Sequence, residues 1–419
     1  MKKAIASFAR AALCAPSALC VVLLVACSST GPEPVALPET VEPIYAMLAS
    51  DPRLAPVVRN ADKFRLQVIL GTVRTDEKGK RQLVQDGYGD GDRYFYPASA
   101  VKLLAAVAAL ERLHKLRRLT GLKMDADTPL IYYPLFPGEE RVDTDTTNIV
   151  GGKVTARHEI RKLFLVSDNE AFNRLYELVG QDELAVLLAR ADLPNARIVH
   201  RLEEARSEEE NRRYPRIDFV GEDFRYSLAE RSSAPLPPGP PALDVTVGTA
   251  YMSGDRRIEG PMDFSQKNRV ALADLQRALC AVVLPDVDCG VEFDLSAEDR
   301  ALLMDAMRDL PRESENPVYD ESAFPDEYVK YFLPGLRRVL DAGRIRECNK
   351  IGQAYGFTTE NAWIVDEDSG RAFFLAATLY TNEDGVLNDD QYDYETVALP
   401  FLADLAEVIA RRVWSVRAQ

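Results

Sequence analysis

The sequence is poor in histidine and tryptophan, with three and two copies among 419 residues. The histidines are His114, His158 and His200, and none lies in an HExxH pattern, which excludes a zincin-type metalloprotease. The six cysteines show no CxxC spacing, so zinc ribbons and thioredoxin-like redox motifs are also excluded. We therefore expect no metal ion and no organic cofactor.

Basic residues are in the minority, with 51 Lys and Arg against 66 Asp and Glu and a net charge of −15. An acidic surface repels phosphate, so no nucleic-acid partner is expected. Apolar residues make up 47% and charged residues 28% of the chain, which is ordinary for a globular protein. The length is compatible with one large or two modest domains.

The longest apolar run near the start of the chain, residues 11–26, is interrupted by Pro16. It is shorter than the ~20 apolar residues that a transmembrane helix needs, and three basic residues precede it. This pattern predicts a secretory signal peptide over residues 1–26. The end of the run, Leu24-Val25-Ala26-Cys27, resembles a bacterial lipobox.

The lipobox predicts that Cys27 is lipidated and that the lipid anchors the protein in a membrane. Serine at position 28 favours the periplasmic face of a bacterial outer membrane. The alternative is an ordinary signal peptide in which the cysteine is incidental. Residues 27–55, which begin with a Ser- and Pro-rich stretch, are expected to be a flexible linker. The rest, residues 56–419, is expected to be the folded domain.

The folded part shows strand patterns at both ends and helical patterns in the middle. Strands are expected over residues 64–74, 81–89, 361–365 and 372–380, and helices over 99–113, 156–166, 170–179, 183–190, 270–283, 297–307, 327–342 and within 394–414. Terminal strands that pair with early strands around a helical middle predict an α+β fold. An α/β lobe with an antiparallel sheet would combine residues 56–95 and 346–419, and an all-helical lobe would hold about 96–345.

Two further features of the domain are less regular. Residues 221–260 contain the segment APLPPGPPAL and are expected to form an irregular insertion. Cys280 and Cys289 are nine residues apart, so they could form a disulfide bond in an oxidising periplasm. Buried free thiols are the alternative.

The first candidate chemical motif is Ser99-Ala-Val-Lys102, just after Pro97 and at the start of the most hydrophobic helical pattern. Lys102 would lie one helical turn after Ser99 and on the same face. Burial lowers the pKa of a lysine, and the resulting neutral amine can activate a serine hydroxyl as a nucleophile. The structural alternative is a helix-capping serine with a lysine that reaches toward solvent.

Two further motifs are Ser167-Asp168-Asn169, after an expected helix, and Lys350-Ile351-Gly352, which opens an expected strand. Ser167 could pass a proton to a leaving nitrogen, and Asn169 could hold a substrate amide. A helix cap is the alternative interpretation of this loop. Lys350 would supply positive potential, and Gly352 would permit close backbone approach to a ligand.

The ordered set S-x-x-K, S-D-N and K-x-G resembles the signature of class A β-lactamases and penicillin-binding proteins. The resemblance covers roughly residues 56–415. It implies that Ser99 is the acylated nucleophile and Lys102 its base or proton relay, with Ser167 as proton shuttle and Asn169 as amide anchor. It also implies that Lys350 assists electrostatically, and that the backbone N–H groups of Ser99 and Gln353 form the oxyanion hole.

The sequence departs from the family pattern in three places. Ile351 stands where the family usually has Thr or Ser, so a hydroxyl for a substrate carboxylate is missing. On the next strand, where many members have an arginine for that carboxylate, stand Thr358, Thr359 and Glu360, and Thr358 or Thr359 could substitute. The E-x-x-L-N signature of the Ω loop is also missing. Arg201-Leu202 resembles the start of that loop, and its glutamate would fall near residue 206.

The nearest acidic residues to that position are Glu208, Glu209 and Glu210. Glu209 and Glu210 are candidates for the group that activates water, and a solvated acidic turn is the alternative. The resemblance implies a β-lactam-hydrolysing serine enzyme. The other hypotheses are a D-Ala peptidase or esterase acting on cell-wall fragments, and a non-catalytic binding lipoprotein.

Overall fold

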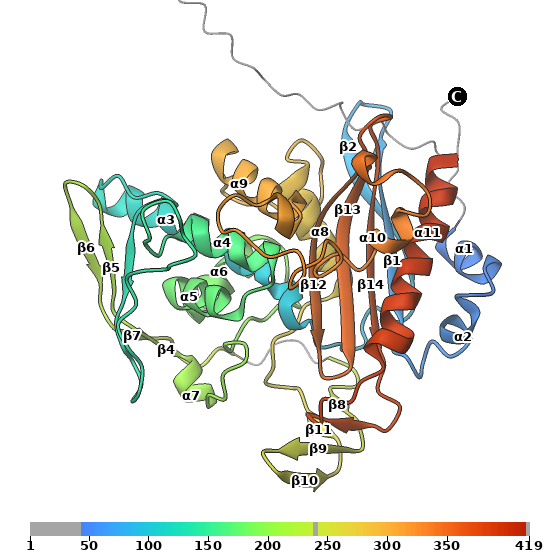
Figure 1. The fold of residues 1–419 in the computed structure, drawn as a ribbon, viewed down its shortest axis with the longest axis horizontal. Helices are drawn as coiled ribbons and strands as arrows, with labels where there is room; N and C mark the ends of the chain where they lie inside the picture. Colours follow the sequence, from blue (N-terminus) through green and yellow to red (C-terminus); the bar gives the residue numbers. More distant parts are fainter. Residues whose placement is uncertain (1–42, 238–241, 416–419) are drawn as a thin grey trace, which may run out of the picture.

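A five-stranded antiparallel sheet forms the centre of the molecule (Figure 1). The computed structural model describes residues 43–237 and 242–415; the expected signal peptide, Cys27 and most of the expected linker lie outside them. The strands follow the order β12-β13-β14-β1-β2, with bounds β1 (Gln67–Thr75), β2 (Arg81–Tyr88), β12 (Ile345–Ala354), β13 (Phe357–Asp366) and β14 (Arg371–Tyr380). Strand β1 pairs with β14, with Leu70 opposite Leu375. The expected pairing of early with late strands, and the α+β class, are confirmed.

Helices cover both faces of this sheet. One face packs against α11 (Leu399–Ser415), in a core that includes Val68, Leu375 and Leu405. The other face packs against α8 (Leu272–Val283), and α9 (Ala297–Arg308) contacts both α8 and β12. Because both faces are covered, β13 and β14 consist almost entirely of buried residues.

The expected linker over residues 27–55 is too long at its C-terminal end. Residues 44–50 form α1 (Ile44–Ser50), which packs against α11 and β2 and is followed by α2 (Ala55–Val58). Ile44, Met47 and Leu48 are completely buried. Burial of each such side chain contributes about 1.5–3 kcal/mol, so this segment is part of the folded domain.

The helical part begins with a short 3₁₀ turn, η1 (Ala98–Val101), which leads directly into α3 (Lys102–Thr120). Residues 102–110 of α3 are all buried, because α4 (Ala156–Leu165), α5 (Asn169–Val179) and α6 (Gln181–Arg190) pack around this helix. The prediction of an all-helical lobe over about 96–345 is wrong in part. The same region also holds a three-stranded sheet at the far end of the molecule (Figure 1), formed by β3 (Leu130–Tyr132), β5 (Ile217–Val220) and β6 (Arg225–Leu228).

Residues 208–263 contain further short elements. Helix α7 (Glu208–Asn211) leads into β4 (Arg213–Tyr214), which pairs with β7 (Arg231–Ser232). Below the central sheet in Figure 1 lie β8 (Thr246–Val247), β9 (Ala250–Ser253), β10 (Arg256–Glu259) and β11 (Met262–Asp263). Strand β9 pairs in parallel with β15 (Val386–Leu387). Much of the expected irregular insertion therefore forms short strands.

The prediction of a helix over residues 327–342 is largely wrong. Only α10 (Leu333–Leu336) forms there, between the short turns η2 (Pro311–Glu313) and η3 (Ala342–Arg344). Pro334 is the second residue of α10 and has no N–H to donate to a preceding turn, so the helix does not extend on its N-terminal side. A Cβ atom on Gly335 would lie 1.7 Å from the carbonyl oxygen of Ala403, so glycine allows α10 to touch α11.

The last expected helix is π-helical at its start, over η4 (Tyr394–Ala398), and continues as α11. Cys280 and Cys289 form a disulfide bond, which decides between the two alternatives, and Cys348 is a buried free thiol. Within residues 43–237 and 242–415, no helix combines the length and the hydropathy needed to cross a membrane.

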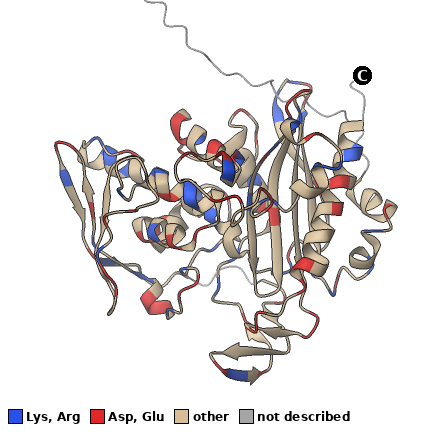
Figure 2. Ribbon diagram, viewed as in Figure 1, with Lys and Arg blue, Asp and Glu red and all other residues tan. Residues whose placement is uncertain are grey.

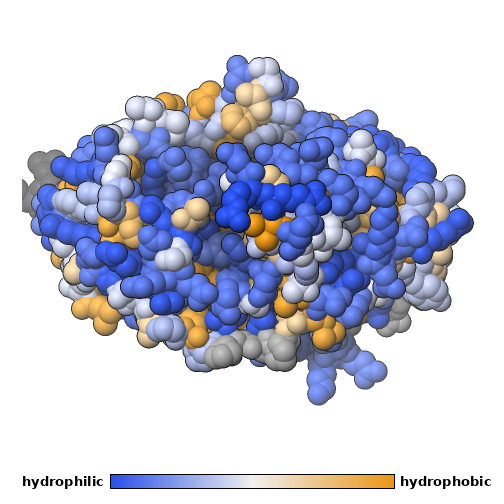
Figure 3. Space-filling model, turned by 90° about the horizontal axis from the view of Figure 1, so that it is seen from below, coloured by the Kyte–Doolittle hydropathy of each residue, from blue (hydrophilic) through white to orange (hydrophobic). Residues whose placement is uncertain are grey.

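Charged side chains are spread over the whole molecule instead of forming a single basic face (Figure 2). Seen from below, the surface is mostly hydrophilic, with small separate apolar patches (Figure 3).

Candidate active site

Ser99 lies in the η1 turn, between the central sheet and the helical part. Ala98, Ala100 and Val101 are buried, whereas Ser99 is partly exposed. Ala98 has a positive φ of 45°, which is strained for a residue with a side chain. The N–H of Lys102 donates to the carbonyl of Ser99, so the two residues are fixed one turn apart. The turn therefore presents the serine to solvent and directs the lysine inward.

Edge strand β12 contacts this turn at Gly352. A Cβ atom at this position would lie 2.1 Å from the carbonyl oxygen of Pro97 and 2.9 Å from the amide nitrogen of Ala100. The close backbone approach expected of Gly352 is therefore to the protein's own serine turn. Gln353 follows on β12 and lies opposite Thr358 of β13.

Lys102 is completely buried, and its ammonium group is held by the Ser167–Asn169 loop. Its Nζ donates to the carbonyl oxygen of Ser167 at 2.5 Å, to Asn169 Oδ1 at 2.5 Å and to Ser167 Oγ at 3.3 Å. Asp168 accepts a hydrogen bond from the N–H of Ala171 and so caps α5. The helix cap expected at the S-D-N motif is confirmed, since Asp168 caps α5, and the two neighbours of Asp168 contact the lysine.

Lys350 reaches the same serine from β12. Its Nζ donates to Ser167 Oγ at 2.8 Å and to the carbonyl of Ile351 at 3.1 Å. Ser167 has a positive φ of 58°, a conformation that costs backbone strain. This strained residue turns both its carbonyl and its hydroxyl toward Lys102. The structure thus brings Lys102, Ser167, Asn169 and Lys350 together next to the turn that carries Ser99.

Burial lowers the pKa of both lysines. The pKa of Lys102 falls well below its usual value, first because of burial and then because of the Lys350 charge, while Asp168 and Glu203 act in the opposite direction. Burial lowers the pKa of Lys350 to about 7; Glu360 opposes this change and Lys330 adds to it. A neutral amine is therefore accessible at neutral pH, as general-base catalysis requires.

The structure also shows where the predicted contacts are incomplete. Within the described part of the chain, no hydrogen bond joins Lys102 Nζ to Ser99 Oγ. Thr358 and Thr359 were hypothesised to bind a substrate carboxylate, but both are completely buried. The Thr359 hydroxyl is hydrogen-bonded to that of Thr378 at 2.8 Å. This hypothesis is wrong, because neither hydroxyl reaches the surface.

Glu209 and Glu210, the candidate water-activating acids, lie in α7. The Glu210 carboxylate accepts the N–H of Ser207 at 2.8 Å and completes a capping box for its own short helix. Glu209 is exposed and lines a hollow with Arg212, Arg213 and Glu230, away from the catalytic motifs. The prediction for these two residues is wrong, because their helix directs them to its own cap and to solvent.

The acid of this segment whose charge raises the pKa of Lys102 is Glu203, an exposed residue that the sequence motifs did not single out. It follows Arg201, whose buried guanidinium donates to Glu177 Oε1 at 2.9 Å and to the carbonyl of Arg213 at 2.8 Å. Asn173 binds both the N–H and the carbonyl of Leu202. The segment on either side of Glu203 is thus fixed. The signal that could have found Glu203 is its position directly after Arg201-Leu202, the pair that resembles the start of the Ω loop.

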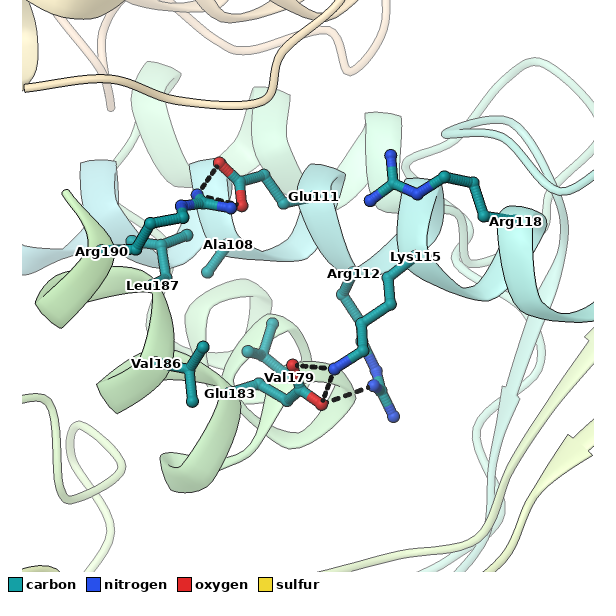
Figure 4. A pocket seen from close by; sticks show the side chains of 10 residues that line it. All are labelled: Ala108, Glu111, Arg112, Lys115, Arg118, Val179, Glu183, Val186, Leu187 and Arg190. Atoms are coloured by element: carbon teal, nitrogen blue, oxygen red, sulfur yellow. Dashed lines mark hydrogen bonds and ion pairs between the residues drawn. The ribbon is translucent and has the colours of Figure 1, made fainter.

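A separate hollow between α3 and α6 is a weaker candidate for a site (Figure 4). Its charged side chains pair with one another: Arg190 with Glu111, and Arg112 and Lys115 with Glu183. These pairs leave little unsatisfied charge to attract a ligand. Among the residues that the structure describes, no group of three or more His, Cys, Asp or Glu is arranged to hold a metal ion.

The model of the β-lactamase enzyme family matches residues 71–218, a segment that contains Ser99, Lys102, Ser167, Asn169 and Glu203. This match confirms the predicted resemblance to β-lactamase- and penicillin-binding-protein-like serine hydrolases and supports a hydrolase. No curated protein matches the chain significantly.

Several solved structures are similar to the chain. A β-lactamase from Desulfarculus baarsii is 16% identical, with 90% of this chain and 98% of that chain covered and a TM-score of 0.46. A β-lactamase from Burkholderia ambifaria is 14% identical, with 86% and 99% covered and a TM-score of 0.47. A PBP-A variant, solved as an acyl-enzyme complex with penicillin G, is 12% identical, with 91% and 100% covered and a TM-score of 0.48.

We expect Gly352→Ala to displace the serine turn, because the added Cβ would overlap the carbonyl oxygen of Pro97. Acylation of Ser99 should slow by about 10²-fold, since a misplacement of about 1 Å has this effect on catalysis. The rate of labelling by a fluorescent penicillin measures it. Gly87→Ala on β2 is the control, because nothing lies within 4 Å of its Cβ position. Equal labelling of both variants would contradict the prediction.

Proposed function

We propose that the protein hydrolyses β-lactams through an acyl-enzyme on Ser99. The observation that supports this proposal most strongly is the convergence of two buried lysines, Lys102 and Lys350, on Ser167 beside the serine turn. Lysines are seldom fully buried without a partner or a function. Here they surround a hydroxyl that could relay protons.

In acylation, Ser99 Oγ attacks the lactam carbonyl carbon and its proton passes to the neutral amine of Lys102. The oxygen that becomes negative is stabilised by the N–H groups of Ser99 and Gln353. When the C–N bond breaks, Ser167 gives its proton to the leaving nitrogen and regains one from a neighbouring lysine. Asn169 uses its Oδ1 atom to hold Lys102, which leaves its NH₂ group free to donate to a substrate amide carbonyl.

Deacylation needs a base that activates water, and we assign this role to Glu203. Its charge acts on Lys102, and the contacts of Arg201 and Asn173 hold the chain on both sides of it. Glu203 itself has a positive φ of 58°, so its backbone is held in a strained conformation. Water would lose a proton to this carboxylate while its oxygen attacks the ester carbon, and as the ester C–O bond breaks that proton would be returned to Ser99 Oγ, which restores both the serine hydroxyl and the carboxylate.

A second candidate function is hydrolysis of a D-Ala peptide or of an ester from the cell wall. The observation that favours the ester is the lack of a carboxylate-binding hydroxyl, because position 351 is isoleucine and Thr358 and Thr359 are buried. An ester substrate needs such a group less than a penicillin does. The same acylation chemistry at Ser99 would serve either substrate.

Intact-protein mass spectrometry with a fluorescent penicillin tests the proposed nucleophile. We expect an adduct of one penicillin per chain that disappears in Ser99→Ala. Rapid nitrocefin turnover with little adduct would support fast hydrolysis, and this turnover should also disappear in the variant. A folded protein with neither adduct nor turnover would contradict β-lactam hydrolysis and favour the ester substrate.

Lys102→Met tests the base. We expect acylation to slow by about 10²–10⁴-fold, the usual contribution of a general base. The fold should survive, because an apolar side chain replaces a charge that is buried at a cost. Stopped-flow labelling measures the rate, and circular dichroism checks the fold. Labelling at the parental rate would show that Lys102 is not the base.

Glu203→Gln should separate the two halves of the reaction. Acylation should continue, whereas hydrolysis of the acyl-enzyme should slow by about 10²–10⁴-fold, so the adduct accumulates. Glu209→Gln is the matched control, since that carboxylate is equally exposed but is not among the charges that act on Lys102. Single-turnover mass spectrometry follows the decay of the adduct. Parental decay in Glu203→Gln would show that another group activates water.

A further inference from the structure

Behind Lys350 lies a set of buried ionisable groups that the proposed reaction does not use. It consists of Lys330, Glu347 and Glu360, with Asn349 between them, and each is at most 3% exposed. A group of buried charges is usually no more stable than well-packed apolar residues of the same size. Its position next to a catalytic strand therefore suggests a function other than stability.

Asn349 joins the charges on this side of the sheet. Lys330 Nζ donates to Asn349 Oδ1 at 2.8 Å, and Asn349 Nδ2 donates to Glu360 Oε1 at 2.8 Å. The N–H of Tyr331 donates to the other carboxylate oxygen of Glu360 at 2.8 Å. Burial raises the pKa of Glu360 to about 7, and the hydrogen bonds to both of its oxygens act in the opposite direction, because they favour the ionised form.

Strand register places Glu360 next to Lys350. Ile351 lies opposite Glu360, and Lys350 lies opposite Asn361. Because successive side chains of a strand point to opposite faces, Lys350 faces Ser167, and Glu360 lies on the other face of the sheet, one position along. A carboxylate with both oxygens bound therefore lies directly behind the ammonium group of the active site.

We propose that Glu360 is a positioning residue that, from behind the sheet, keeps Lys350 protonated while Lys350 donates to Ser167. This inference rests on the proposed function. The charged groups that act on Lys350 are Glu360 on β13 and Lys330 before α10, and the charges of Lys350 and Lys102 on α3 also interact. Glu360 is the acid among them that lies on the strand paired with β12.

The electrostatic effects agree in sign with this geometry. Lys330 lowers the pKa of Lys350, and Glu360 raises it, so that the pKa stays at about 7 in spite of complete burial. Glu347 lies on β12, the strand that carries Lys350, but within the described structure neither of its carboxylate oxygens has a hydrogen-bond partner. Burial raises the pKa of Glu347 to about 8. Glu347 is thus a buried acid without the contacts of Glu360.

The two acids allow a matched experiment. In Glu360→Gln the pKa of Lys350 should fall, so the decline of acylation at high pH should move to lower pH by about one unit. In Glu347→Gln the pH profile should stay where it is. The rate is measured with a fluorescent penicillin across the pH range. An unchanged profile in Glu360→Gln, or an equal shift in both variants, would overturn the proposal.

A second measurement does not depend on the reaction. Lysines labelled with ¹³C at Cε are titrated by NMR, and the Lys350 signal is identified by its loss in Lys350→Arg. Its midpoint should fall in Glu360→Gln and not in Glu347→Gln. If the protein forms no adduct, the proposed function fails, but this titration still decides the role of Glu360. An unmoved midpoint in Glu360→Gln would overturn that role.

A third variant covers failure to fold. Glu360→Met removes the same charge and puts an apolar side chain of similar size in its place, and it should give the same shift of the Lys350 midpoint. If Glu360→Gln and Glu360→Met both fail to fold, Glu360 is a structural residue and the proposal is overturned.

Discussion

Two buried lysine amines that share one serine hydroxyl are the constraint on which this site depends. Lys102 and Lys350 both contact Ser167 Oγ, and the charge of Lys350 lowers the pKa of Lys102. Such a pair is tolerable only where acceptors surround it. The carbonyl of Ser167 and the side chain of Asn169 supply these acceptors for Lys102. Ser167 can offer both of its oxygen atoms because its backbone adopts a strained, left-handed conformation.

The geometry of this pair depends on segments that are far apart in sequence. Pairing of β1 with β14 joins the N-terminal and C-terminal strands into one sheet, and β12 is the edge strand next to η1. The absent side chain of Gly352 then lets β12 lie against the backbone of the serine turn. Backbone contact between β12 and the η1 turn therefore holds the site together, and this contact determines where the side chains of the site lie. At position 352 the size of the side chain matters more than its chemical type, since a single methyl group there would push β12 away from the serine turn.

Much of this arrangement could be predicted from the sequence, because short motifs report on local geometry. Ser99 and Lys102 are one turn apart in any helical conformation, and an S-D-N sequence caps a helix whatever else it does. The role of Glu203 was missed because it depends on the path of an irregular segment. Arg201 and Asn173 fix that path through contacts with backbone groups, which leave little trace in a sequence.

Burial was equally hard to foresee on the strands. Thr358 and Thr359 looked like hydroxyls near a catalytic strand, but helices cover both faces of the sheet, so their side chains are enclosed. The helix expected over residues 327–342 has the right apolar spacing, yet Pro334 and the contact of Gly335 with α11 restrict it to one turn. In both cases a tertiary contact decided what the local pattern left open.

The same burial bears on which substrates the site can select. Ile351 is itself buried, so β12 presents no hydroxyl that could orient a carboxylate. Any anionic group on a substrate would then be attracted by lysine charge alone, and lysine is a point charge with weak directional preference. Because the pKa of Lys350 is only about 7, that attraction would weaken as the pH rises. Glu360, the buried acid behind β12, counteracts this loss of positive charge because it raises the pKa of Lys350. Selection between an anionic lactam and an uncharged ester would thus depend on how much of the Lys350 charge survives in the closed site.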